Sequence, residues 1–259
     1  MSLSNVKIKC TSYRFMGENM SEEKNNYQIA WESFWKSLTG DQQDVLWNVS
    51  HDEAASSDFE LFREFVEESP LPLVDTGCGD GTQTEFFGQH LKKVVGVDVS
   101  AAAIQIAQQN SKLSNISYQV LDLLNTEDCI RFHQRLGDSH VYMRGVLMQF
   151  SPEDRLKAVA NLKILIGSQG YLFMNEYVPQ TKAYYQEIFQ QQGMPAGFHR
   201  VLQHGITPGG ITDVELKEFF PDQDYEPVRK GNYLMHTNIQ LADGSYAKAP
   251  SFYLILKKR

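Results

Sequence analysis

The sequence predicts an α/β protein built on a doubly wound, mostly parallel β-sheet. Five short apolar segments between residues 71 and 177 alternate with amphipathic helical segments, a pattern typical of β-α units. A glycine-rich turn directly follows the first of these segments, at a place where open α/β sheets bind ligands. Later in the chain, two extended segments flank Asp243-Gly244, which predicts an antiparallel hairpin.

Two helices are expected before the first strand. Apolar residues recur at helical spacing in the first of them: Tyr27, Ala30, Trp31, Phe34, Trp35 and Leu38. Ser57 and Glu60 have the spacing of a capping box and predict the start of the second helix, which stops before Pro70. The aromatic stripe has two interpretations, packing against the domain or a lid over a ligand, and we expect a mixture of both. Residues 1–66 are therefore predicted to be a helical lid or extension, and residues 67–259 the main domain.

The β-α units then follow one another in order. The predicted strands are LPLVDT (71–76), KVVGVDV (93–99), ISYQVLD (116–122), HVYMRG (140–145) and GYLFMNEY (170–177). The predicted helices are TQTEFFGQHL (82–91), an Ala-rich helix after Ser100, residues 126–136, a helix opened by Ser151-Pro152, and a helix that starts near Thr181. Residues 193–211 are less regular, and Thr212 and Glu215 cap a short helix that ends at Pro221.

The composition argues against several classes of function. The chain has 259 residues, 42% of them hydrophobic, and a net charge of −8 without a dense basic run, so nucleic acid is not an expected partner. Cys10, Cys78 and Cys129 give neither a disulfide framework nor a zinc pattern, and no metal is expected. No apolar run approaches the roughly 18 residues of a membrane span, and the first residues lack the apolar core of a signal peptide. We therefore expect a cytoplasmic protein.

The glycine-rich turn, LVDTGCGDGTQT at residues 73–84, is open to several interpretations. A phosphate-binding P-loop needs Gly-Lys-Ser/Thr, and here Gly81 is followed by Thr82. In the dinucleotide fingerprint the third glycine would stand at Thr82. Asp75, two residues before Gly77, would repel a pyrophosphate. The turn therefore favours a positively charged ligand without phosphate.

At this point the sequence resembles the class I S-adenosylmethionine-dependent methyltransferases, whose first motif is acid-x-Gly-x-Gly-x-Gly at the end of the first strand. Asp75-Thr76-Gly77-Cys78-Gly79-Asp80-Gly81 matches that motif. The resemblance covers residues 70 to 180 and implies a seven-stranded sheet in which the hairpin supplies the last two strands. It also implies S-adenosylmethionine as cofactor and methyl transfer to an oxygen or nitrogen of a small molecule.

The resemblance further implies a set of cofactor-binding residues at the ends of four strands. Asp98 would hold the ribose hydroxyls, with Val99 beside it, and Asp122 and the N–H of Leu123 would meet the adenine. The backbone at Arg144 and Gly145 would flank the methionine part. From the glycine loop the implied residues are Asp75, Thr76, Gly77, Cys78, Gly79 and Gly81. Taken alone, Asp122 reads better as a helix cap; the ordered set of strand-end acids favours the cofactor.

Two residues are candidates for a catalytic base, which is needed only when the acceptor atom carries a proton of high pKa. His204 lies in a loop-like stretch after the fifth strand, and its alternative is an ordinary surface histidine. Glu176 closes the fifth strand, and its alternative is a cap or a salt-bridge partner. Arg144 could bind a substrate carboxylate or pair with an acid such as Glu176.

Other functions stay open at this stage. A nucleotide-dependent oxidoreductase and a non-catalytic methyltransferase-like binding subunit are the alternatives to a small-molecule methyltransferase. DNA amino-methyltransferases of this fold carry Asn-Pro-Pro-aromatic after the fourth strand, where this chain reads Arg144-Gly145-Val146-Leu147. The segment 193–224 is predicted to be a lid-like insertion, with possible hinges at Gly193, Gly197, Gly205, Gly209 and Gly210.

Overall fold

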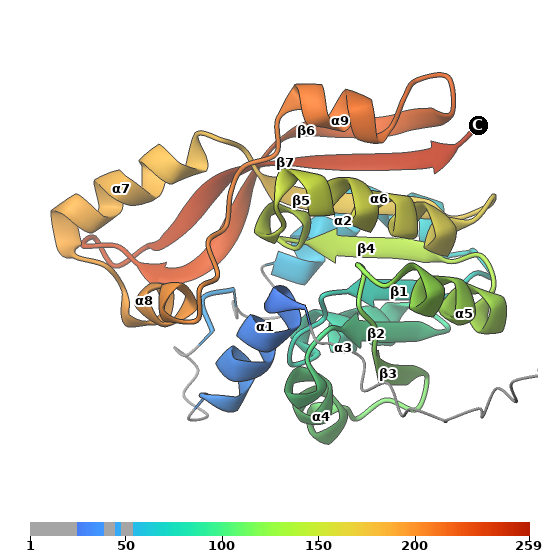
Figure 1. Ribbon diagram of the computed structural model, residues 1–259, viewed down its shortest axis with the longest axis horizontal. Coiled ribbons are helices and arrows are strands. Elements are labelled where there is room, and N and C mark those ends of the chain that lie inside the picture. The colour runs from blue at the N-terminus through green and yellow to red at the C-terminus, as the bar shows by residue number, and fades with distance from the viewer. Residues whose placement is uncertain (1–24, 39–44, 48–53) are drawn as a thin grey trace, which may run out of the picture.

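A computed structural model describes residues 25–38, 45–47 and 54–259; residues 1–24 of the predicted N-terminal extension lie outside it. The described chain contains a seven-stranded sheet of order β3-β2-β1-β4-β5-β7-β6, covered by helices on both faces (Figure 1). The strands are β1 (Leu73–Thr76), β2 (Val94–Asp98), β3 (Ile116–Val120), β4 (His140–Arg144), β5 (Tyr171–Tyr177), β6 (Tyr225–Gln240) and β7 (Tyr246–Lys258). Strands β1 to β5 are parallel, and β7 runs antiparallel between β5 and β6. The predicted sheet and hairpin are confirmed.

Several of the helices begin at a side-chain cap that the sequence predicts. They are α1 (Asn26–Lys36), α2 (Ala54–Val66), α3 (Thr82–His90), α4 (Ala101–Asn110), α5 (Thr126–Leu136), α6 (Pro152–Ile166), α7 (Thr181–Gln192), α8 (Ala196–Gln203) and α9 (Asp213–Phe219), with a 3₁₀ turn, η2 (Leu147–Gln149). Ser100 and Ser151 accept from the third residue of α4 and α6, respectively. Thr212 and Glu215 form a reciprocal capping box at α9. These three caps are confirmed.

Two local predictions are wrong. Helix α2 begins at Ala54, so Ser57 lies inside the helix rather than at its cap. Ala54 and Ala55, ahead of the predicted cap, are already helical and buried in the core. The stretch 193–211 was predicted to be irregular, but it contains α8, which lies between Gly193 and Gly205. Its start is set by Pro195, whose fixed φ of −60° suits the residue before a helix.

The reversal of strand order creates the place where a ligand can bind. From β1 the chain builds outward to β2 and β3, and then returns to place β4 on the other side of β1. All residues of β1 and β2 are buried, as expected for central strands covered on both faces. The carboxyl ends of β1 and β4 therefore diverge into a crevice at a topological switch point.

The closing hairpin is longer than the sheet it joins. Residues 251–257 of β7 pair with β5, whereas residues 246–250 pair only with β6. This outer part of the hairpin packs against α7, through contacts of Met235 and Ile239 with Tyr185 and Ile188 (Figure 1). The hairpin thus forms a wall beyond the carboxyl ends of the strands.

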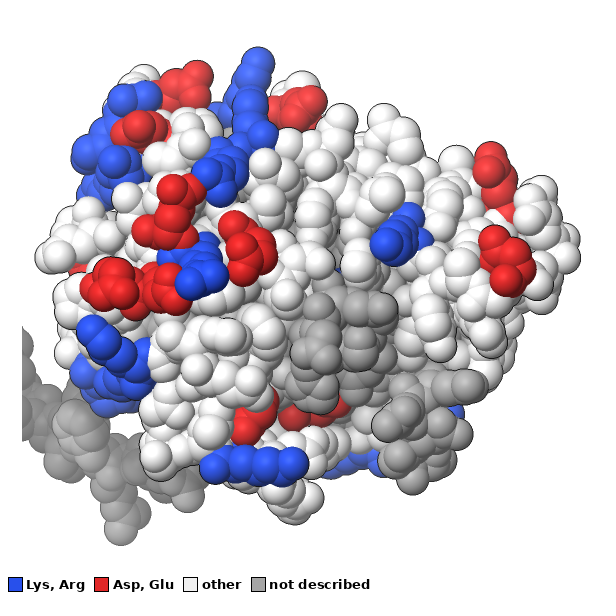
Figure 2. All heavy atoms as spheres, turned by 180° about the vertical axis from the view of Figure 1, so that it is seen from behind, with Lys and Arg blue, Asp and Glu red and all other residues white. Residues whose placement is uncertain are grey.

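The charged side chains show no concentration of one sign on the face seen in Figure 2, where acidic and basic residues are interspersed. Among the described helices, none is long and apolar enough to cross a membrane. Within the same residues, no group of His, Cys, Asp and Glu side chains could hold a metal ion. Cys78 and Cys129 are buried free thiols.

Candidate active site

A pocket lies at the switch point, between the strand ends, α1 and the hairpin. The glycine loop contributes Gly77 and Gly79 to its lining. Both have positive φ, +71° and +55°, which suits glycine. A Cβ on Gly77 would lie 2.4 Å from Val146 Cγ2, and one on Gly79 would lie 2.8 Å from the Trp35 ring. The loop therefore has no room for side chains on its pocket side.

Four other residues of the predicted loop lie behind the pocket rather than in its lining. They are Asp75, Thr76, Cys78 and Gly81. Asp75 accepts from Thr84 Oγ1 at 2.5 Å, and burial raises its pKa to about 7. Thr76 Oγ1 donates to the Tyr142 carbonyl at 2.9 Å. These side chains support the loop from below.

Asp98 lies in the lining at the end of β2. Its Oδ2 accepts from the Gly79 N–H at 3.1 Å, and its Oδ1 accepts from the Ser100 N–H at 2.8 Å. Burial raises the pKa of Asp98 to about 6, although these bonds oppose the rise. A carboxylate has about four acceptor positions, so these two hydrogen bonds and a third from the Val99 N–H orient Asp98 and leave acceptor capacity for a ligand. Val99 is also in the lining.

Asp122 and Leu123 line the same pocket beyond the end of β3. Asp122 Oδ1 accepts from the Leu124 N–H at 2.8 Å, and Oδ2 accepts from the side chain of Asn25. The N-cap of α5 is Asn125, so the alternative role of Asp122 as the helix cap is wrong. The strand-end acids Asp98 and Asp122 therefore share one pocket.

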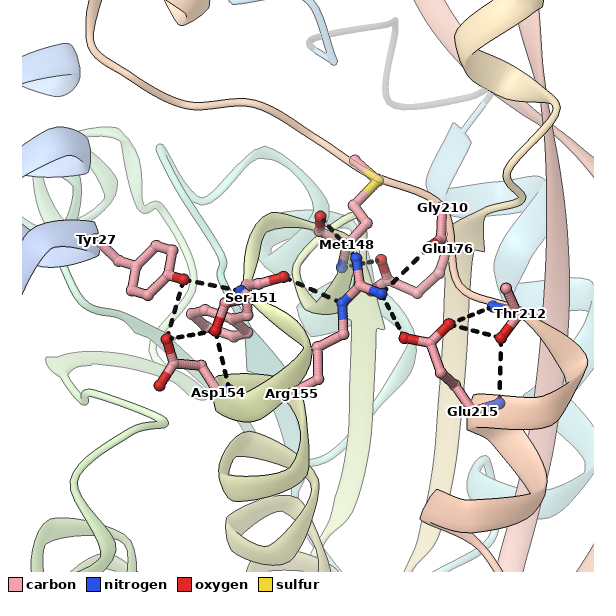
Figure 3. Close-up of polar contacts among 10 residues, drawn as sticks. Tyr27, Met148, Ser151, Asp154, Arg155, Glu176, Gly210, Thr212 and Glu215 are labelled. Carbon is pink, nitrogen blue, oxygen red and sulfur yellow. Dashed lines mark hydrogen bonds and ion pairs between the residues drawn. The ribbon is translucent and has the colours of Figure 1, made fainter.

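Helix α1 covers this pocket with aromatic rings. Tyr27, Trp31 and Trp35 belong to the lining, whereas Phe34 is fully buried in a cluster with Val201 of α8. The Tyr27 hydroxyl donates to Asp154 at 3.0 Å and accepts from the Ser151 N–H at 2.8 Å, which ties α1 to the start of α6 (Figure 3). Helix α1 therefore places rings both in the core and in the pocket lining, and the role of a lid over a ligand stays a prediction.

Glu176 lies below the pocket lining. Its carboxylate accepts from the N–H groups of Val146, Leu147 and Met148 at 2.9, 2.9 and 3.0 Å. Burial raises its pKa to about 7, against these three bonds and the charge of Arg155. These contacts hold the η2 turn after β4. Arg155 adds bonds to the carbonyls of Met148 and Gly210 and an ion pair with Glu215 at 2.6 Å (Figure 3).

His204 lies at the end of α8, outside the pocket lining. Its Nδ1 is 3.0 Å from Ser33 Oγ on the outer side of α1, and its ring packs edge-on against Phe34. The structure therefore brings neither His204 nor Glu176 to the pocket.

The end of the pocket near β4 and the hairpin contains Arg144, Gly145, Met148, Tyr177 and Met235. The sequence predicted only the first two of these. Tyr177 ends β5, the strand next to β4, and that position was the available signal for it. Met235 had no such signal, because only the pairing of β6 with β7 brings it to the pocket.

Comparisons with known proteins agree with this geometry. A crystal structure of an S-adenosylmethionine-dependent methyltransferase from Anabaena variabilis superposes with a TM-score of 0.85 at 33% identity, over 91% of this chain and 96% of that one. Residues 73–170 match the family described as "Methyltransferase domain". The chain belongs to the S-adenosylmethionine-dependent methyltransferases. An assignment to the oxidoreductases is therefore not retained.

Two further methyltransferases are more distant. Ubiquinone biosynthesis O-methyltransferase from Coxiella burnetii is 30% identical over 147 residues, which are 54% of this chain and 59% of that one. The match thus spans little more than half the length of that curated methyltransferase. Magnesium protoporphyrin IX methyltransferase from Synechocystis, with bound S-adenosylhomocysteine, shares the fold at 17% identity and a TM-score of 0.55, over 89% of this chain and 93% of that one.

The pocket residues of this methyltransferase fit its cofactor, S-adenosylmethionine. Asp98 and Asp122 offer acceptors for hydroxyl and amino groups, and the glycines let the backbone of the loop line the pocket where a Cβ would collide with Val146 or Trp35. Trp31 and Trp35 add aromatic rings to the same lining.

Proposed function

We propose that this chain transfers a methyl group from S-adenosylmethionine to an oxygen or nitrogen of a small molecule. The observation that carries the proposal is the continuity of one pocket. Acceptors for the adenosine, Asp98 and Asp122, line one end, and a chemically different set around Arg144 and Tyr177 lines the other. A donor and an acceptor molecule can therefore meet inside one enclosure.

In this proposal the strand ends hold the cofactor. Asp98 would accept from the ribose hydroxyls, and Asp122 with the Leu123 N–H would meet the adenine. Gly77, Gly79 and the backbone at Gly145 would flank the amino-acid part. Asp75, Thr76, Cys78 and Gly81 would act indirectly, by holding the loop in its conformation.

When bound, S-adenosylmethionine would supply a methyl group on a positively charged sulfur, activated for transfer to an electron pair of the acceptor. The chain's own contribution is to orient the two molecules and to exclude water, which can supply much of the rate acceleration. Tyr27, Trp31 and Trp35 would do the latter from α1. Neither Glu176 nor His204 is included as a base, because neither lines the pocket.

We also propose that α1 and the segment 193–224 close over the site as lids. Gly193 and Gly205 have φ of +81° and +76° and open space around them, which suits hinges. Gly210 does not suit one, because a Cβ there would lie 2.2 Å from Pro179 N. Residues 209–211 are also anchored by the bonds of Gly209 N–H to Met148 and of Ile211 N–H to Tyr177.

The proposal is tested by calorimetry with S-adenosylmethionine, S-adenosylhomocysteine and NAD⁺, followed by measurement of S-adenosylhomocysteine release with a panel of small hydroxyl, amine and carboxylate compounds. Binding of the first two ligands and acceptor-dependent release are expected. Cofactor binding with only slow hydrolysis across the panel would instead indicate a binding subunit without turnover.

A further inference from the structure

The end of the pocket away from Asp98 and Asp122 contains a buried cation. Arg144 is the last residue of β4 and lines the pocket, yet its side chain is only 5% exposed. Its Nη2 donates to the carbonyl of His236 on β6 at 2.7 Å. Its Nε has no hydrogen-bond partner among the described residues. A guanidinium has five N–H donors, so most of its capacity is unused in this environment.

Asp58, an acidic residue close to Arg144, accepts its hydrogen bonds from other side chains. Asp58 of α2 is 1% exposed, and its Oδ2 lies 3.6 Å from Arg144 Nε, within ion-pair distance but without a hydrogen bond. The Asp58 carboxylate instead accepts from Tyr142 Oη at 2.7 Å and Asn175 Nδ2 at 3.2 Å. Asp58 thus lies within ion-pair distance of Arg144 without accepting a hydrogen bond from it, and Arg144 Nε has no acceptor among the described residues.

Apart from one hydroxyl pair and the amide of Gln149, the side chains named at this end are apolar. Gln149 Nε2 donates to the Gly145 carbonyl at 3.0 Å, and its Oε1 has no hydrogen-bond partner among the described residues. A Cβ on Gly145 would meet Met148 Cε at 3.2 Å and Met235 Sδ at 3.9 Å, so two flexible thioether side chains converge there. Tyr177 lines the pocket, and its hydroxyl lies 2.7 Å from that of Tyr185. An occupant would therefore need an anionic group for Arg144 and an apolar body for the methionines.

The cofactor also has a carboxylate, which could compete for Arg144, but the pocket contains a different polar side chain that could bind it. Gln83, in the first turn of α3, lines the pocket beside the glycine loop. Arg144 instead contacts the hairpin through His236, on the side of β4 that faces β5 and β6. The buried guanidinium therefore belongs to the acceptor's part of the pocket.

We propose that Arg144 determines acceptor specificity and that the methyl acceptor is a small molecule with a carboxylate on an apolar body. This inference rests on the proposed function, since it names the substrate class of the same pocket. Two N–H donors of a guanidinium match the two oxygens of a carboxylate, and the buried setting penalises a neutral compound that would leave them unpaired.

The test measures binding without turnover. The protein is saturated with S-adenosylhomocysteine, and calorimetry is carried out with matched acids and carboxamides: benzoate and benzamide, 3-phenylpropanoate and 3-phenylpropanamide, octanoate and octanamide. At least one acid should bind about tenfold or more tightly than its amide, the effect expected of a charge-assisted bond. In Arg144→Met this preference should vanish, and in Arg144→Lys it should persist in part.

Because Arg144→Met leaves Asp58 buried without its cation, the double variant Asp58→Asn/Arg144→Met serves as the second test. It removes both charges together and should lose the acid preference while remaining folded. Equal binding of acids and amides by the wild type, or an acid preference that survives in both variants, would overturn the inference.

A cofactor control separates the two possible carboxylates. Affinities for S-adenosylhomocysteine and for 5′-methylthioadenosine, which lacks the amino-acid part, should be unchanged in Arg144→Met, whereas Gln83→Ala should weaken only the former. A selective loss of S-adenosylhomocysteine in Arg144→Met would assign Arg144 to the cofactor and refute the inference. If the wild type fails to bind S-adenosylhomocysteine at all, the proposed function itself fails, which is a separate result.

Discussion

The carboxylate of Glu32 on α1 accepts a hydrogen bond from Ser100 Oγ at 2.7 Å and another from the Ala102 N–H at 3.0 Å. Ser100 is also the N-cap of α4 and directly follows the Asp98-Val99 pair of the pocket. Helix α1, the proposed lid, is thereby bonded to the strand end that carries the proposed ribose acceptor. Despite partial burial, the hydrogen bonds from Ala102 and Ser100 and the charge of Lys36 lower the pKa of Glu32 to about 2.

We predict that Glu32→Ala loosens α1 and weakens binding of S-adenosylhomocysteine. The change removes two hydrogen bonds to a charged acceptor, each worth about 1.5–3 kcal/mol, and with them the position of Trp31 and Trp35. Hydrogen exchange should become faster in residues 26–36. Lys36→Ala is the control, since it removes only an ion pair whose lysine is 66% exposed. Equal effects of the two substitutions would contradict this role.

Asp98→Ala should weaken the binding of both S-adenosylmethionine and S-adenosylhomocysteine by about 10- to 150-fold, the value of a charge-assisted bond of about 1.5–3 kcal/mol. Calorimetry on the variant checks this. Asp80→Ala is a matched control, because Asp80 lies in the same loop outside the pocket lining. Unchanged affinity in Asp98→Ala would remove Asp98 from the ribose site.

The affinity for S-adenosylhomocysteine should fall as the pH is lowered through about 6. Burial raises the pKa of Asp98 to about 6 in the free protein, and ribose hydroxyls donate to the ionised carboxylate. The folding stability of the free protein should show the opposite trend and rise as the pH is lowered through about 6. The pKa of Asp98 in the folded protein lies above its unfolded value of 3.8. Its contribution to folding stability is therefore fully present below pH 3.8, where Asp98 is neutral in both states, and is lost as the pH rises through about 6. Calorimetry from pH 5 to 8 tests this, with Asp98→Asn as the control that lacks the contribution of Asp98. Asp75 and Glu176, whose pKa values burial raises to about 7, titrate in both proteins.

Gly77→Ala should abolish cofactor binding and lower stability, since its Cβ would lie 2.4 Å from Val146 Cγ2 at a φ of +71°. The double variant Gly77→Ala/Val146→Ala removes that clash and should recover part of the lost melting temperature. It should not recover binding of S-adenosylhomocysteine, because the new methyl group still occupies the pocket side of the loop. Recovered binding would show that the single variant acted through folding alone.

Local signals predicted most of the fold. Strands β1, β2, β4 and β5 have continuous apolar runs, and α5 was predicted with its observed bounds of Thr126–Leu136 because Asn125 and Gly137 mark its ends. Helix α8 was not predicted because glycine or proline lies close to both of its ends. Its apolar residues are explained only by tertiary packing, in which Val201 joins the cluster of Phe34 from α1. The predicted cap at Ser57 was wrong because the helix already includes Ala54 and Ala55, whose burial depends on contacts with distant parts of the chain.

The cofactor end of the site was more predictable than the acceptor end. Asp98 and Asp122 stand at strand ends, and the pattern of parallel strands brings such ends to one edge. Asp58 and Met235 gave no signal, because each reaches the neighbourhood of Arg144 through packing between distant elements. From the sequence alone, an aspartate within an amphipathic helix is expected to face solvent. Asp58 is instead buried and accepts hydrogen bonds from Tyr142 and Asn175.

The strand order has a consequence for how the protein assembles as it is synthesised. Strand β7 follows β6 in the chain but lies between β6 and β5 in the sheet. Strand β6, and Met235 with it, can therefore join the sheet only after a later segment has been made. The nascent chain would complete its adenosine-binding strand ends first and its acceptor wall last. A ribosome-bound intermediate halted before β7 should therefore bind the adenosine part of the cofactor but lack the part of the pocket that would hold the methyl acceptor.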